Sequence, residues 1–244
     1  MSFEEVCRDL YPNTINLDAF AHWSADVLAP LGFRRDNTLA VVSVCRDELM
    51  FPLEDALHEQ WGAAFNMSGL GAMVFGGRTG FAAASQHAPD IDGRQRFLFI
   101  VLPHIGIGEN GSIGSVRREG QVHGGTACGA LIAARDDLCT ETPSLELDPH
   151  DIELSLLRRE LYERLGAGPA PSLERLTELA RQAATDEVIH LEAELYRRAD
   201  TDTAIISGIV VHGPRANQVG ADRVAVIEAW ARLGNDPTKV SLVH

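Results

Sequence analysis

The sequence predicts an α/β fold in which a central sheet is flanked by helices. Apolar runs at residues 38–44, 97–103 and 203–211 are rich in β-branched and aromatic side chains and predict buried strands. Amphipathic helical patterns alternate with these runs, which is typical of α/β proteins. No repeat, low-complexity tract or convincing linker interrupts the chain, so we expect residues 1–244 to form a single domain.

Two helices are predicted in the first quarter of the chain. Residues 17–31 carry apolar side chains at helical spacing, with Asn16 as a plausible cap and Pro30-Leu31-Gly32 as a stop. Residues 52–61 predict a second helix. The stretch 68–81 is rich in glycine, which permits close backbone approach or positive φ.

The last third of the chain predicts more helix. Residues 151–165 and 172–198 show amphipathic periodicity with many Glu and Arg residues, and residues 224–233 predict a final helix. The segment 166–171, rich in Gly, Ala and Pro, separates the first two helices and marks a possible subdomain border.

Net charge and cysteine content exclude several classes of function. The 244 residues carry a formal charge of −14, which disfavours binding to nucleic acid and to anionic membrane surfaces. Four cysteines do not form a disulfide framework in a chain of this size, and we expect no role for Cys7 or Cys139. The acidic first residues are unlike a signal peptide, so we expect a cytoplasmic protein.

Three potential metal ligands stand at the ends of predicted elements. Cys45 directly follows the strand at 38–44, His104 follows the strand at 97–103, and Cys128 lies in a turn of small residues. Two thiolates and an imidazole would form a zinc site with three protein ligands and an open fourth position, as in catalytic zinc centres. Residue by residue, the alternatives are a small core hydrophobe for each cysteine and a hydrogen-bonded structural residue for the histidine. Spacing alone does not choose between these interpretations.

Ordered motifs strengthen the metal interpretation. They span roughly residues 38–135 and are Val44-Cys45-Arg46-Asp47-Glu48, Gly69-Leu70-Gly71 with Phe75-Gly76-Gly77-Arg78-Thr79-Gly80-Phe81, His87-Ala88-Pro89-Asp90, Pro103-His104-Ile105-Gly106-Ile107 and Thr126-Ala127-Cys128-Gly129-Ala130. With these motifs the chain resembles the limiting-carbon-dioxide-inducible B protein family, also called θ-class carbonic anhydrases, which is similar in fold and zinc site to β-class carbonic anhydrases.

The resemblance implies a carbonic anhydrase on a β-carbonic-anhydrase-like α/β fold. Its zinc ion would be held by Cys45, His104 and Cys128, and its substrates would be carbon dioxide and bicarbonate. The resemblance also implies a homodimer or a dimer of dimers, without nucleic acid or membrane partners.

Asp47 is the expected catalytic carboxylate, because it could accept a hydrogen bond from zinc-bound water. An arginine partner would keep Asp47 ionised and away from the metal. β-Class enzymes carry Cys-x-Asp-x-Arg, but this chain has Leu49 at the arginine position, so the partner is expected to be Arg46 or, as second choice, Arg78. The alternative for Asp47 and Arg46 is a solvated ion pair at a strand end.

His87 is the first candidate for a proton shuttle, because an imidazole titrates near ~6.5. A loop histidine that hydrogen-bonds the backbone is an equally good interpretation of His87. His123 and His212 are weaker candidates for the same role.

Other functional interpretations stay open. A homologue could keep the fold and zinc but lack turnover and act as a binding or scaffold component. Alternatively, Cys45 could be a nucleophile beside Arg46. A dinucleotide fingerprint at residues 106–111 is discounted because no helical pattern follows it. Glu187 and His190 match half of a di-iron motif, and a solvated helix face explains them better.

Overall fold

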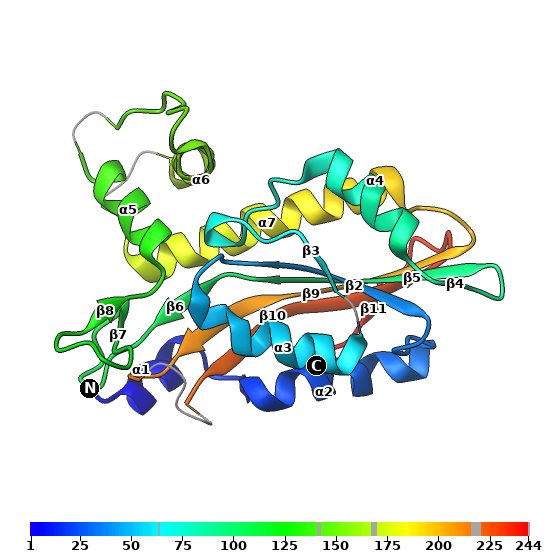
Figure 1. The fold of residues 1–244 in the computed structure, drawn as a ribbon, viewed down its shortest axis with the longest axis horizontal. Coiled ribbons are helices and arrows are strands. Elements are labelled where there is room, and N and C mark those ends of the chain that lie inside the picture. Colours follow the sequence, from blue (N-terminus) through cyan, green and yellow to red (C-terminus); the bar gives the residue numbers. More distant parts are fainter. Residues whose placement is uncertain (63, 141–142, 167–169, 216–220, 244) are drawn as a thin grey trace.

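A computed structural model describes residues 1–62, 64–140, 143–166, 170–215 and 221–243. Within these residues the fold is a mixed α/β sheet flanked by seven helices (Figure 1). The main strand order is β1-β10-β9-β5-β2-β3, and β4, β6 and β11 pair with β5, β9 and β10 respectively. The strands are β1 (Thr14–Asn16), β2 (Thr38–Val44), β3 (Ala64–Asn66), β4 (Asp90–Ile91), β5 (Arg94–Leu102), β6 (His104–Gly106), β9 (Thr201–His212), β10 (Arg223–Leu233) and β11 (Val240–Ser241), with a separate hairpin of β7 (Ser115–Val116) and β8 (Gly125–Thr126).

The helices cover both faces of the sheet. In Figure 1, α2 and α3 lie on one face, α4 and α7 lie on the other, and α5 and α6 stand at one end. Their bounds are α1 (Phe3–Leu10), α2 (Leu17–Leu28), α3 (Phe51–Trp61), α4 (Gly77–His87), α5 (Gly129–Leu138), α6 (Ile152–Leu165) and α7 (Leu173–Leu195). The sequence therefore predicted α2, α3, α6 and α7 close to their observed bounds.

Alternate residues of strand β2 pack into two different apolar cores. Ala40, Val42 and Val44 of β2 belong to a core with α2 and α3, whereas Leu39 and Val41 belong to a core with α4 and the carboxyl half of α7. This alternation follows from the period of two residues in a strand. Because both faces are covered, β2 is buried along its whole length and reads as a continuous apolar run.

Residues 224–233 form strand β10, so the prediction of a final helix there is wrong. The strand pairs antiparallel with β9, and its register shifts between Val226 and Glu228. A bulge of this kind breaks the alternation of apolar and polar residues that would identify a strand. Alanine, glutamate, arginine and leucine in the same segment favour a helix intrinsically, and sheet pairing overrides that preference.

Helix α4 lies where the sequence predicted only a glycine-rich stretch and a loop. Glycine lowers helix propensity, which hid the helix. Gly80 packs against the end of a flexible side chain, because a Cβ atom there would lie 2.6 Å from the terminal Cε atom of Met67. Of the segment 166–171, residues 167–169 lie outside the described residues, so the suggested subdomain border is not assessed there.

The parallel strands bring the predicted ligand segments to one end of the sheet. β2 pairs parallel with β5, β5 pairs parallel with β9, and β6 continues along β9 with His104 opposite Val210. The carboxyl ends of β2 and β5 therefore lie beside β6. Chemistry in open α/β sheets is typically found at this edge.

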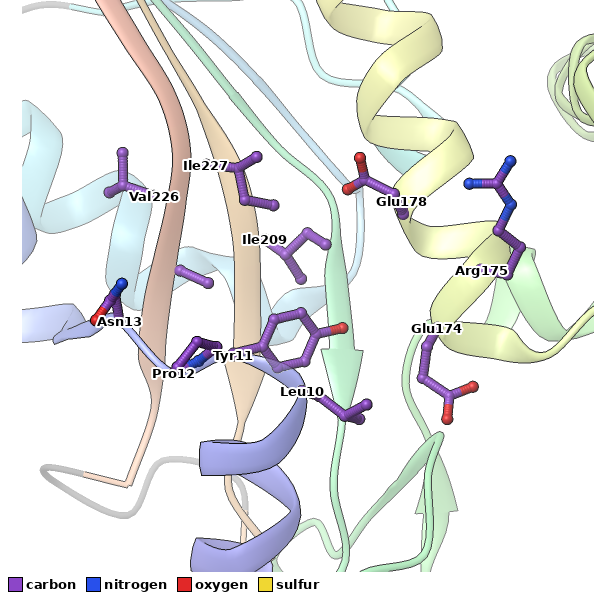
Figure 2. A pocket seen from close by; sticks show the side chains of 11 residues that line it. Leu10, Tyr11, Pro12, Asn13, Glu174, Arg175, Glu178, Ile209, Val226 and Ile227 are labelled. Carbon is purple, nitrogen blue, oxygen red and sulfur yellow. The ribbon is translucent and has the colours of Figure 1, made fainter. Parts of the chain in front are cut away.

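A pocket with a volume of about 480 Å³ lies apart from the ends of β2 and β5. Figure 2 shows Tyr11, which follows α1, beside Ile209 of β9 and Ile227 of β10, with α7 next to them. None of the residues that line the pocket is Cys45, His104 or Cys128.

No described helix combines the length and the apolar character that crossing a bilayer requires.

Candidate metal centre

Cys45, His104 and Cys128 come together although they lie on three separate segments. Cys45 follows β2, His104 opens β6, and Cys128 caps the amino terminus of α5. One sulfur or nitrogen atom from each lies within 4.8 Å of the others. All three residues are buried, with at most 3% of their surface exposed. Among the described residues, this is the group of His, Cys and acidic side chains arranged to hold a metal ion.

The two thiols share a proton rather than a disulfide bond. Their Sγ atoms are 3.4 Å apart, whereas a disulfide measures about 2.05 Å. The hydrogen bond from Cys128 lowers the pKa of Cys45 to about 4, with help from a backbone N–H of Gly71. The same bond and burial raise the pKa of Cys128 well above its usual value. The pair therefore presents one thiolate and one proton that a metal ion would displace.

Backbone N–H groups point at both sulfur atoms. Gly71, at φ +63°, directs its N–H at Cys45, and this left-handed conformation favours glycine. Ala130 and Leu131, in the first turn of α5, direct their N–H groups at Cys128. These groups have no partner within the helix, and they stabilise negative charge on sulfur.

His104 presents an unpaired nitrogen to this cluster. Its Nδ1 atom lies 3.0 Å from Nε2 of His212, whose Nδ1 atom lies 2.9 Å from a carboxylate oxygen of Asp222. The Nε2 atom of His104 is buried and has no hydrogen-bond partner. A buried polar atom without a partner is costly unless something binds it. Two sulfur atoms and one imidazole nitrogen are donors of the type that suits a zinc ion.

Asp47 lies next to this nitrogen. One of its carboxylate oxygens is 3.7 Å from Nε2 of His104, and the other accepts a hydrogen bond from the backbone N–H of Leu49 at 3.2 Å. Arg118 donates to both oxygens of Asp47, at 3.1 and 3.4 Å. Burial raises the pKa of Asp47.

Arg118 holds the site's carboxylates in place. It lies in the loop between β7 and β8, where it also binds the Glu48 carboxylate and donates to the carbonyl of Thr126 at 2.9 Å. Its hydrogen bond lowers the pKa of Glu48 to about 2. Sequence reasoning missed this residue, because 71 positions separate Arg118 from Asp47 and no motif links them.

The two arginines that the sequence favoured pair elsewhere. Arg46 binds Glu153 of α6 at 2.8 Å and the carbonyl of Ser68 at 3.0 Å. Arg78 binds Glu194 of α7 at 2.8 Å. Although Arg46 is adjacent in sequence, neighbouring residues of an extended segment point to opposite sides. The expected partnership of Asp47 with Arg46 or Arg78 is therefore corrected to Arg118.

The three histidines weighed as proton shuttles have different positions. His87 is exposed at the end of α4 and packs edge-to-face against Phe65 with ring centres 5.4 Å apart. His123 is exposed in the β7–β8 loop that carries Arg118. His212 is fully buried on the Nδ1 side of His104, and burial lowers its pKa. The structure thus places neither His87 nor His212 beside the unpaired Nε2 atom.

The two discounted motifs have ordinary surroundings. The glycine fingerprint at 106–111 leaves β6 into a loop, and the next helix begins only at Gly129. His190 is largely exposed and lies 3.6 Å from the Glu194 carboxylate.

Comparison with known families identifies the group to which this site belongs. The family described as limiting CO2-inducible proteins B/C beta carbonic anhydrases matches residues 14–228. The chain belongs to this family. The matched segment contains all three potential ligands, Asp47 and Arg118, so the resemblance inferred from the motifs is confirmed.

Solved structures of the family share the fold. The crystal structure of PtLCIB4, a homolog of the limiting CO2-inducible protein LCIB, matches with a TM-score of 0.83 and 26% identity over 98% of each chain. The structure of LCIB matches with a TM-score of 0.76 and 28% identity, covering 96% of this chain and 97% of that one. The predicted β-carbonic-anhydrase-like architecture is therefore confirmed. A comparison with curated proteins finds no significant match.

Proposed function

We propose that this protein is a zinc-dependent carbonic anhydrase that interconverts carbon dioxide and bicarbonate. The observation that carries the proposal is the convergence of two thiols and an unpaired imidazole nitrogen beside a carboxylate held by arginine. Membership of a carbonic anhydrase family supports the same reaction. Carbon dioxide and bicarbonate are therefore the proposed substrates.

Cys45, His104 and Cys128 would hold the ion, and the residues present suit it in number and type. Zinc bound by them would lower the pKa of a coordinated water to about 7 and so supply hydroxide near neutral pH. The backbone N–H groups directed at Cys45 and Cys128 withdraw charge from the sulfur atoms. This partly offsets the electron donation by which thiolates weaken the acidification of water.

Asp47 is the proposed hydrogen-bond acceptor for the attacking water. One of its oxygens lies 3.7 Å from the Nε2 atom of His104, so the carboxylate stands next to the nitrogen that would bind the ion. Arg118 and the N–H of Leu49 fix the carboxylate, so its rotation toward the metal position would break three hydrogen bonds. Positioning of this kind contributes to rate by holding the reacting groups in place.

A small apolar cluster is the proposed wall against which carbon dioxide rests. Leu49, Val116 and Ala127 are buried together, apart from the two main cores. Each stands within two residues of a site residue, namely Asp47, Arg118 and Cys128 respectively. A linear apolar molecule gains from such a surface because burying it removes apolar area from water.

Two measurements on the purified protein test the proposal. Metal analysis should find about one zinc ion per chain, the stoichiometry of a single site, and exchange of oxygen-18 from labelled carbon dioxide should be catalysed above the rate in buffer. Bound zinc without exchange would favour a catalytically silent family member that acts as a binding component. A protein without metal, whose buried Cys45 reacts with thiol reagents faster than the exposed Cys139, would favour the nucleophile interpretation and contradict the proposal.

Oligomeric state and compartment are also predictions at this point. We expect a homodimer, which sedimentation velocity would detect as twice the chain mass. Free thiols at the centre suit a reducing compartment such as the cytoplasm, and fractionation of cells tests that expectation.

A further inference from the structure

His104 is backed by a line of two further buried groups. His212, the last residue of β9, directs Nε2 at Nδ1 of His104 over 3.0 Å, and the two rings meet edge-to-face at 83°. Asp222 lies just before β10, and one of its carboxylate oxygens is 2.9 Å from the Nδ1 atom of His212. His104 and His212 are fully buried, so water does not satisfy these nitrogens.

We propose that His212 and Asp222 are positioning residues that fix the tautomer of His104 and aim its Nε2 atom at the two thiols. This inference rests on the proposed zinc function, because it assigns a purpose to that ligand orientation. Metal-binding histidines commonly donate their second nitrogen to a carboxylate or a carbonyl. Here a second imidazole stands between the ligand and the carboxylate.

Hydrogen-bond direction follows from the chemistry of the end member. An ionised carboxylate only accepts, so Nδ1 of His212 must carry the proton that Asp222 receives. A neutral ring then leaves Nε2 of His212 as an acceptor, and Nδ1 of His104 must be the donor. Nε2 of His104 is consequently left with its lone pair free, and it is the buried atom that has no partner.

Asp222 is itself fixed, which makes the line rigid. Its second carboxylate oxygen accepts the backbone N–H of Gly213 at 3.0 Å. β6 and β9 are paired in register with Gly106 opposite His212, so the sheet holds both histidine backbones. The tautomer is thus imposed by groups on neighbouring strands and not by the solvent.

The test compares His212→Leu, which removes the acceptor, with His212→Gln, whose side-chain oxygen can still accept from His104. Zinc affinity is measured by competition with a chelator. His212→Leu should weaken affinity by roughly 10–100-fold, the usual effect of losing such a partner, while His212→Gln should stay close to wild type. Equal affinity in all three proteins, or equal loss in both variants, would overturn the inference.

A second readout reports the tautomer without metal or activity. Nitrogen-15 NMR of the metal-free protein should show the His104 ring proton on Nδ1 in wild type and on Nε2 in His212→Leu. If His212→Leu does not fold, Asp222→Asn takes its place, because the amide cannot accept from both His212 and Gly213. A proton on Nε2 of His104 in wild type would refute the inference. If the wild-type protein binds no zinc, the proposed function itself is contradicted, whatever the position of the His104 proton.

Discussion

Two buried polar clusters lie at opposite ends of the same parallel strands. At the carboxyl end, Cys45, His104 and Cys128 converge. At the other end, buried Asp202 pairs with arginines at the start of β5, and buried Glu192 binds Arg232 of β10. The first cluster gathers lone pairs around one point, whereas the second pairs each carboxylate with a guanidinium.

The difference shows which buried cluster needs a further component. Opposite charges compensate one another, so Arg232 balances the charge of Glu192, although Oε2 of Glu192 accepts no hydrogen bond. Cys45, Cys128 and the bare Nε2 atom of His104 instead offer lone pairs to one point. A metal ion would accept those lone pairs, which is why the first cluster is interpreted as a site and the second as structural.

The largest effect is expected from Cys128→Ser. Serine keeps the size of the side chain but does not supply a thiolate, so zinc content should fall from about one ion per chain to near zero. Oxygen-18 exchange should be lost with it. Cys139→Ser, at an exposed free cysteine, is the matched control and should keep both. Full zinc content in Cys128→Ser would contradict the interpretation of the Cys45, His104 and Cys128 cluster as a metal site.

A large loss of stability, without loss of metal, is expected from Glu192→Gln. The change leaves the Arg232 guanidinium buried without a negative partner, which costs about 3–5 kcal/mol in unfolding free energy. Urea denaturation measures that loss, and zinc content should not change. Replacing both Glu192 and Arg232 by Met should recover part of the stability. A drop in zinc content with unchanged stability would show that the Glu192–Arg232 pair supports metal binding and is not purely structural.

A smaller effect, on rate alone, is expected from Arg118→Gln. Loss of the guanidinium frees the Asp47 carboxylate to rotate, so kcat should fall by ~10²-fold while zinc stays bound. Arg46→Gln is the matched control, since Arg46 binds Glu153 and not Asp47, and it should keep most of the activity. A larger loss of kcat in Arg46→Gln than in Arg118→Gln would instead support Arg46, the partner that the sequence predicted.

The smallest effect is expected from Arg78→Gln. Its ion pair with Glu194 is exposed, and exposed pairs contribute little to stability. Neither the melting temperature nor oxygen-18 exchange should change measurably. A clear loss of exchange would mean that the first turn of α4, which carries Arg78, contributes to the reaction after all.

The ligands could be predicted from sequence because each marks the end of a continuous apolar run or a small-residue turn. Cys45 follows β2 directly, and β2 has the predicted bounds, residues 38–44. Arg118 could not be found this way, because it lies in a loop without periodicity and meets Asp47 only after the β7–β8 hairpin folds. The pair His212 and Asp222 was equally hidden, since the line depends on the register of β6 against β9.

The sequence by itself determined the α/β class and the strand that ends at Cys45, because periodicity is a local property of short segments. Ordered motifs that resemble a known family singled out Cys45, His104 and Cys128 as candidate ligands. Only the tertiary structure decided which arginine meets Asp47, which nitrogen of His104 is free, and that residues 223–233 form a strand. Those outcomes depend on pairing between segments far apart in the chain, and the free energy of that pairing exceeds local preference.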